Sequence, residues 1–141
     1  KKYLQILAGT DNDTIRFTRN GNSQTLLPGS ANVVAYIGHD GLMDFSLESP
    51  PEHNGTSTRE AIILACASKL YFKDVVKTAG AKPLLWTTNL MAPEAYSLKA
   101  ALDGWIKNES DEQIRLRAAA AYSKYQHCSL SAAERLFATG F

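Results

Sequence analysis

Two apolar runs decide the fold of this chain: Val33-Val34-Ala35-Tyr36-Ile37-Gly38 and Ala61-Ile62-Ile63-Leu64-Ala65. Each run is short, continuous and bounded by Gly, Pro or Ser residues, which is typical of a strand buried on both faces of a parallel sheet. A reactive side chain follows each run, His39 after the first and Cys66 after the second. Because function in open α/β sheets collects beyond the carboxyl ends of the strands, we expect the imidazole and the thiol to meet at one edge of the sheet.

The segments around these runs complete an α/β pattern. Residues 3–8 and 83–88 are predicted as strands and residues 69–79 as a helix, so the segment 61–88 reads strand, helix, strand, which implies a right-handed crossover and a parallel sheet. A hairpin is expected at residues 14–27, with Asn20-Gly21 as its two-residue turn. Residues 42–47 alternate like a short surface strand. The predicted fold is a mainly parallel central sheet with an N-terminal edge hairpin and a helical C-terminal third, whose helices open near Pro93, Ser110 and Ser131.

Composition limits the function classes. The chain has 141 residues, of which 45% are hydrophobic and 21% charged, and a formal net charge of +1, which indicates one globular domain over residues 1–141. It has no basic run that would bind nucleic acid or an anionic membrane. No apolar run approaches the roughly 18 residues that suggest a membrane span. Because the chain starts Lys1-Lys2-Tyr3 without Met, we expect it to be a fragment of a longer chain, from which a signal peptide or another segment is missing.

The two cysteines, Cys66 and Cys128, are too few for a disulfide scaffold, and no Cys-x-x-Cys pair suggests zinc. We therefore predict free thiols, no metal and no cofactor. Free thiols slightly favour a reducing, cytoplasmic compartment and leave the location otherwise open.

Each candidate residue has a plainer interpretation. Cys66 could be an ordinary core cysteine, but it ends a buried strand just before a predicted helix, whose N-terminus favours a thiolate and offers N–H groups to an oxyanion. His39 could be a turn histidine, but Gly38 and Gly41 leave room for the chain to bend and for a substrate to approach. Asp44 is interpreted as a solvated carboxylate, with orientation of His39 or binding of a cationic group as the alternatives.

Over residues 31–90, the order of strand, His39-Asp40-Gly41, strand and Ala65-Cys66-Ala67-Ser68 resembles the caspase–legumain group of cysteine peptidases. The resemblance implies a caspase-like three-layer sandwich and a catalytic dyad of Cys66 and His39. It also implies an oxyanion hole made by the backbone N–H groups of Gly41 and Cys66. The substrate-binding positions would be Asp40, Ser68, Trp86, Thr87 and Thr88.

Three functions remain open at this point. The first is a caspase-like cysteine peptidase or hydrolase that cleaves peptide or amide bonds of a peptide or protein substrate through a thioester. The second is a non-catalytic caspase-like module, suggested by Asp40 standing where the family has glycine after the histidine. Its apolar helical segments 118–125 and 136–137 would dock a partner or form a homo-oligomer. The third is another cysteine-dependent hydrolase or amidotransferase-type domain, which would not require a histidine on the strand before the cysteine strand.

Overall fold

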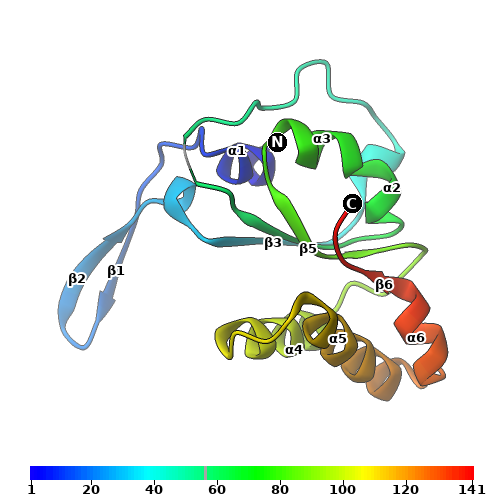
Figure 1. Ribbon diagram of the computed structural model, residues 1–141. Helices are drawn as coiled ribbons and strands as arrows, with labels where there is room; N and C mark the ends of the chain where they lie inside the picture. The colour runs from blue at the N-terminus through cyan, green and yellow to red at the C-terminus, as the bar shows by residue number, and fades with distance from the viewer. Residues whose placement is uncertain (56) are drawn as a thin grey trace.

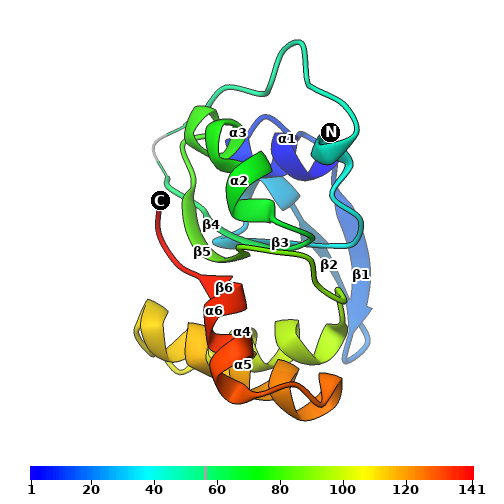
Figure 2. The same cartoon turned by 90° about the vertical axis from the view of Figure 1, so that its right-hand side faces the viewer.

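Three parallel strands and one short antiparallel strand form the central sheet, in the order β3-β4-β5-β6 (Figures 1 and 2). The computed structural model describes residues 1–55 and 57–141. In it, β3 (Val33–Ile37), β4 (Glu60–Leu64) and β5 (Lys82–Thr87) run parallel, and β6 (Phe137–Ala138) is antiparallel to β5. The protein is therefore α/β with a mixed sheet, and both apolar runs are strands, as the sequence predicts.

Strand β4 lies at the centre of the core because it is apolar on both faces. Ala61 and Ile63 are fully buried in one apolar cluster, together with Trp86. Ile62 and Leu64 are fully buried in a second cluster. Side chains of a strand alternate between the faces of its sheet, so a continuous apolar run needs cover on both sides.

Helices supply that cover (Figures 1 and 2). The first cluster contains residues of α1 and α3, and the second contains residues of α4 and α5. A last helix, α6, leads directly into β6. The helices are α1 (Lys2–Ala8), α2 (Ser68–Tyr71), α3 (Lys73–Thr78), α4 (Ala95–Ile106), α5 (Asp111–Gln126) and α6 (Leu130–Leu136). None of the helices among the described residues is long and apolar enough to cross a bilayer.

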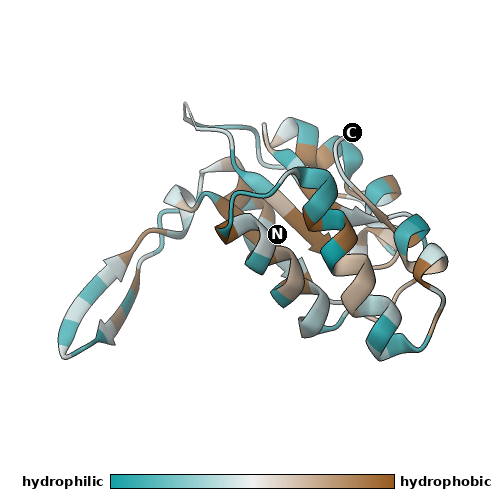
Figure 3. Ribbon diagram, turned by 60° about the horizontal axis from the view of Figure 1, so that its bottom comes forward, coloured by the Kyte–Doolittle hydropathy of each residue, from teal (hydrophilic) through white to brown (hydrophobic). Residues whose placement is uncertain are grey.

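The predicted hairpin forms, but it is a separate two-stranded sheet of β1 (Ile15–Arg19) and β2 (Asn22–Leu26). Asn20 and Gly21 both have positive φ, 50° and 78°, as a two-residue hairpin turn requires. The hairpin projects from the body of the protein and is largely hydrophilic (Figures 1 and 3). The expected place at the edge of the central sheet is therefore wrong, because β1 and β2 pair with each other in a sheet of their own and almost every hairpin residue is exposed.

Two other strand predictions are wrong. Residues 3–8 belong to helix α1, because Leu4, Leu7 and Ala8 share one buried helical face. Residues 42–47 form no strand. Instead, a 3₁₀ turn, η2 (Gly41–Met43), is capped by Asp40, whose carboxylate accepts the N–H of Leu42.

The helical predictions hold, with shifted boundaries. Ser110 and Gln113 form the predicted capping box of α5, and Pro93 lies just before α4. The single helix expected over residues 69–79 is divided at Phe72 into α2 and α3. Strand β6 was not predicted, because a strand of two residues is too short to show a hydrophobic periodicity in the sequence.

Arg115 on α5 ties the C-terminal segment to the body, because its guanidinium donates to the carbonyl oxygens of Glu134 and Phe137. We expect Arg115→Ala to cost about 1 kcal/mol of stability and to speed amide exchange in the peptide 134–141. Hydrogen–deuterium exchange by mass spectrometry measures this. Arg117→Ala is the matched control, because Arg117 lies on the same helix as Arg115 but pairs with Glu109, which precedes that helix. Equal exchange in the two variants would contradict the role of Arg115.

Candidate active site

The pairing of β3 with β4 places His39 and Cys66 at the same edge of the sheet. Ile37 lies opposite Leu64 in the last pair of the ladder, and the N–H of Gly38 extends the ladder by donating to the carbonyl of Leu64 at 3.2 Å. His39 and Cys66 each follow their member of this pair by two residues. The two candidate residues therefore leave neighbouring parallel strands at matching positions.

Cys66 lies in a sharp turn between β4 and α2. Ala67, the next residue, has φ of 48°, in the left-handed region that a non-glycine residue rarely occupies. The N–H of Ala67 donates to the carbonyl of Asn89 at 2.9 Å. The N–H of Met91 points at the sulfur of Cys66 at 3.4 Å. The loop after β5 thus gives the partly buried sulfur of Cys66 a hydrogen-bond donor.

The buried hydroxyl groups of Ser68 and Thr87 hold this turn against β5. The Oγ of Ser68 donates to the carbonyl of Ile63 at 2.8 Å and accepts the N–H of Thr87 at 2.9 Å. The hydroxyl of Thr87 in turn donates to the carbonyl of Ala65. These bonds join the residues on both sides of Cys66 to β5. They hold Cys66 in position.

The resemblance implied that Ser68, Trp86 and Thr87 bind a substrate, and their burial contradicts this. All three side chains are fully buried in the chain, so they cannot meet a substrate and act as support for the turn. Thr88 is exposed, and its hydroxyl donates to the carbonyl oxygens of Arg135 at 2.7 Å and Leu136 at 3.2 Å. A role of Thr88 in substrate binding stays a prediction.

His39 is oriented by a carboxylate. Its Nε2 lies 2.6 Å from Oδ2 of Asp44, across the η2 turn, and both side chains are exposed, at 72% and 65%. The hydroxyl of Tyr36 donates to the carbonyl of His39 at 2.6 Å and fixes the backbone there. A carboxylate on Nε2 favours the tautomer with the proton on Nε2 and leaves Nδ1 with a free lone pair. Asp44 is thus exposed, as its interpretation as a solvated carboxylate expects, and it is also paired with His39, as the alternative expects.

Among the described residues, the side chains of His39 and Cys66 form no hydrogen bond with each other. The imidazole is bonded to Asp44, and the thiol lies 3.6 Å from the carbonyl of Met91. Hydrogen bonds between catalytic groups are often long in a free enzyme and form with the substrate in place. The strand register gives the two residues matching positions at one edge of the sheet, and each side chain has another partner there.

The oxyanion hole is not preformed at Gly41. The N–H of Gly41 donates to the carbonyl of His39 at 3.1 Å, so it would have to leave this partner to reach an oxyanion. The ring of Phe45 covers Gly41 so closely that a Cβ there would lie 2.8 Å from it. Gly41 and Cys66 as oxyanion donors stay a prediction.

Asp40 is part of the support of the turn. It is fully buried, one carboxylate oxygen accepts the N–H of Leu42 at 3.0 Å, and the other oxygen is buried without a partner. This burial raises the pKa of the Asp40 carboxyl. The expected contact of Asp40 with a substrate is therefore wrong, because its side chain is fully buried beneath the loop that carries His39.

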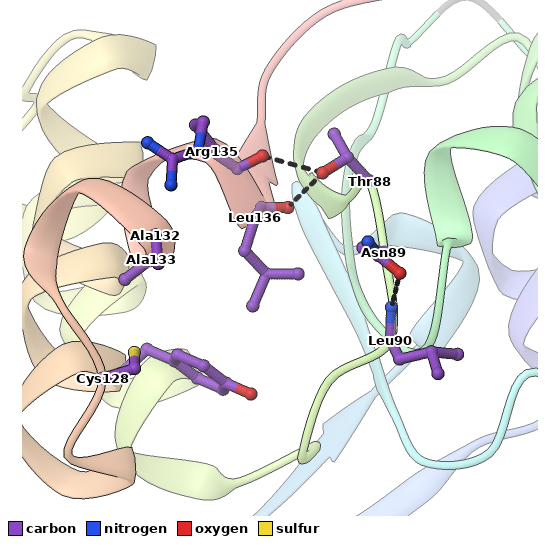
Figure 4. Close-up of a pocket in the computed structure, with 9 residues that line it drawn as sticks. Thr88, Asn89, Leu90, Cys128, Ala132, Ala133, Arg135 and Leu136 are labelled. Carbon is purple, nitrogen blue, oxygen red and sulfur yellow. Dashed lines mark hydrogen bonds between the residues drawn. The ribbon is translucent and has the colours of Figure 1, made fainter.

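A pocket lies beside residues 88–90, the loop that follows β5, and it contains the other cysteine, Cys128 (Figure 4). It has a volume of about 480 Å³ between residues 88–90 and α6. Cys128 and Tyr122 line it, and Cys66 does not. Within residues 1–55 and 57–141, no group of three or more His, Cys, Asp or Glu side chains could hold a metal ion.

Comparisons of the chain with protein-family models, with curated proteins and with solved structures find no match. A functional assignment therefore depends on the chemistry of the residues at the sheet edge.

The left-handed conformation of Ala67 predicts an unusual response to glycine. Ala67→Gly should stabilise the protein by about 0.5 kcal/mol, because relief of the left-handed strain exceeds the entropy that glycine adds to the unfolded chain. Ala67→Val should cost about 2 kcal/mol or more, because a β-branched residue is a strong outlier there. Urea denaturation measures both. Ala120→Gly on the exposed face of α5 is the control and should cost about 1 kcal/mol. If Ala67→Gly destabilises as much as the control, the turn does not have this conformation.

The buried carboxyl of Asp40 predicts a pH-dependent gain in stability on substitution. Its pKa is raised in the folded state, so wild-type stability falls as the pH rises through the region above about 4. Asp40→Asn keeps the acceptor for Leu42 and carries no charge. We expect its melting temperature to exceed that of the wild type by about 3 °C at pH 7 and by much less at pH 4. Glu52→Gln in an exposed loop is the control. A gain of the same size at both pH values would rule out the charge of Asp40 as the cause.

Proposed function

We propose that this chain is a caspase-like cysteine hydrolase that cleaves peptide or amide bonds. Cys66 is the nucleophile, His39 the general base and acid, and Asp44 the residue that positions His39. The observation that supports this most strongly is the register of β3 and β4, which gives the thiol and the imidazole matching places at one sheet edge. The helices on both faces of the sheet agree with the three-layer sandwich that such an enzyme would have.

The reaction follows from these groups. Nδ1 of His39 takes the proton of the Cys66 thiol as the sulfur attacks the carbonyl carbon and a C–S bond forms. The C–N bond then breaks, and the amine leaves with the proton from His39. Water hydrolyses the thioester, with His39 removing a proton from the water and returning it to the sulfur. The Met91 N–H, 3.4 Å from the sulfur of Cys66, stabilises the negative charge that develops on the sulfur as the proton leaves.

A non-catalytic docking module has less support, because its expected surface is inside the protein. In the segments 118–125 and 136–137, the side chains of Ala118, Ala119, Tyr122, Leu136 and Phe137 are buried in the core of the chain itself. Tyr125 is the exposed large apolar residue of these segments. A partner or a second copy would therefore find little apolar area there.

Alkylation by iodoacetamide tests the proposed pair without knowledge of the substrate. At pH 7, we expect Cys66 to be labelled faster than Cys128, as measured by peptide mass spectrometry. His39→Ala should slow the labelling of Cys66 by roughly 100-fold, the size of a general-base effect, and leave the labelling of Cys128 unchanged. Cys128→Ala is the matched control. The proposal fails if Cys128 is labelled and Cys66 is spared, or if His39→Ala has no effect.

Asp44 needs a test that separates positioning from stability. Asp44→Ala should slow the labelling of Cys66 by about tenfold, the loss of one charge-assisted hydrogen bond, and Asp44→Glu should restore most of the rate. Nitrogen-15 chemical shifts of His39 report the tautomer directly, and the Nε2-protonated form should dominate only when residue 44 carries a carboxylate. An unchanged tautomer in Asp44→Ala would contradict the positioning role.

A further inference from the structure

Strand β3 forms an open margin of the central sheet. It pairs with β4 on one side, and in the part of the chain that the structure describes it pairs with no strand on the other. The hairpin of β1 and β2 projects beyond the amino end of β3 and does not run alongside it (Figure 1). The sheet therefore ends in an edge strand of five residues.

The hydrogen bonds at the two ends of the β3–β4 ladder show which residues of β3 face β4. The N–H of Glu60 donates to the carbonyl of Asn32 at 2.8 Å, and the N–H of Gly38 donates to the carbonyl of Leu64 at 3.2 Å. Successive residues of a strand direct their backbone groups to opposite sides. The even-numbered residues from 32 to 38 therefore bond to β4.

The odd-numbered residues Val33, Ala35 and Ile37 direct their N–H and C=O groups away from the sheet. Within residues 1–55 and 57–141, these groups have no hydrogen-bond partner in the chain. Each of the three residues offers one donor and one acceptor. The open edge is thus a ready template for a further strand.

This edge lacks the features that usually keep a strand from pairing with another chain, such as a charged residue, a proline, a bulge or a very short length. The segment from Asn32 to Gly38 contains no charged residue and no proline, and the β3–β4 register has no shift. The other strands carry such protection. The hairpin has Arg16 and Arg19, and β6 is only two residues long.

A second copy of β3 complements the open edge fully. When the two strands run antiparallel with Ala35 opposite Ala35, Val33 of each copy lies opposite Ile37 of the other. All three pairs are then of the hydrogen-bonded kind, in which the two residues exchange both of their N–H···O bonds. Every outward group gains a partner in this register, whereas a slipped register leaves some of them unpaired.

The side chains on this edge are also suited to the pairing. Val33 and Ile37 are half-buried against the second apolar cluster, and Ala35, which lies between them on the same face, is exposed. Cross-strand pairs of β-branched residues such as Val33 and Ile37 stabilise a sheet. Because the segment carries no charge, no like charges would meet across the pair.

We propose that two copies of this chain form a symmetric dimer through β3, in which the two central sheets join into one continuous sheet. The contact is isologous, with Ala35 at the two-fold axis, because the same five residues serve both copies. This dimer does not depend on the chemistry of Cys66, so it holds or fails separately from the proposed hydrolase.

Sedimentation velocity of the purified chain in a thiol reductant tests the association, since the reductant excludes dimers linked through a cysteine. We expect a reversible dimer with a dissociation constant on the order of 50 μM, because two paired strands bury less area than a standard interface. The measurement runs from about one tenth to ten times that concentration.

Charges at the two-fold axis test the register. Ala35→Glu and Ala35→Lys each place two like charges opposite one another, which should raise the dissociation constant at least about tenfold. A one-to-one mixture of the two variants pairs opposite charges and should form a heterodimer about as tightly as the wild type. The matched control is Ala120→Glu, at an exposed alanine of α5. Circular dichroism checks that each variant is folded.

Amide exchange measured by NMR identifies the strand. The N–H groups of Val34 and Tyr36 bond to β4 and should be protected at every concentration. Those of Val33, Ala35 and Ile37 should exchange fast in the monomer and become several-fold slower as the dimer forms.

Three results would overturn the proposal. The first is a chain that stays monomeric over the whole concentration range. The second is a dimer that neither Ala35→Glu nor Ala35→Lys weakens, because such a dimer uses another surface. The third is a mixture of these two variants that does not associate, because Ala35 would then not face Ala35.

Discussion

The parallel pairing of β3 with β4 is the constraint on which the rest of the structure depends. Five residue pairs, from Val33 and Glu60 to Ile37 and Leu64, fix the relative positions of the strands. A slip by one residue would turn every side chain of a strand to the other face of the sheet. Because β4 is buried on both faces, such a slip would cost much of the stability of the core. The same register also sets the positions at which His39 and Cys66 follow the sheet.

The residue after each candidate catalytic residue carries a local cost. Asp40, which follows His39, has a buried carboxylate oxygen without a partner. Ala67, which follows Cys66, has a left-handed backbone. Unfavourable conformations and buried polar groups persist where the surrounding structure holds them, and they gather at functional sites. Two such costs at one sheet edge are consistent with a site shaped for more than stability.

The sequence predicts the parts of this protein that have a long or distinctive pattern. The two apolar runs, the Asn20-Gly21 hairpin turn and the capping box at Ser110 each carry a local physical signal. Helix α1 was missed because a short apolar run fits a strand and a helix equally well. The burial of Trp86 and Thr87 depends on helices and a strand contributed by distant residues, so no local pattern reveals it. Orientation of His39 by Asp44 was one of the alternatives that the sequence left open, and Asp40-Gly41 favours it because this turn signal brings the residues on either side together.

Strand β6 limits how any peptide can approach the sheet. It runs antiparallel along β5, with Ala138 opposite Trp86 and Phe137 opposite Thr87. The backbone groups that β5 could have offered on that side are already engaged by the chain's own C-terminal segment. A further strand therefore cannot pair with β5 on that side, and the edges that the central sheet leaves open to pairing are β3 and the two-residue β6.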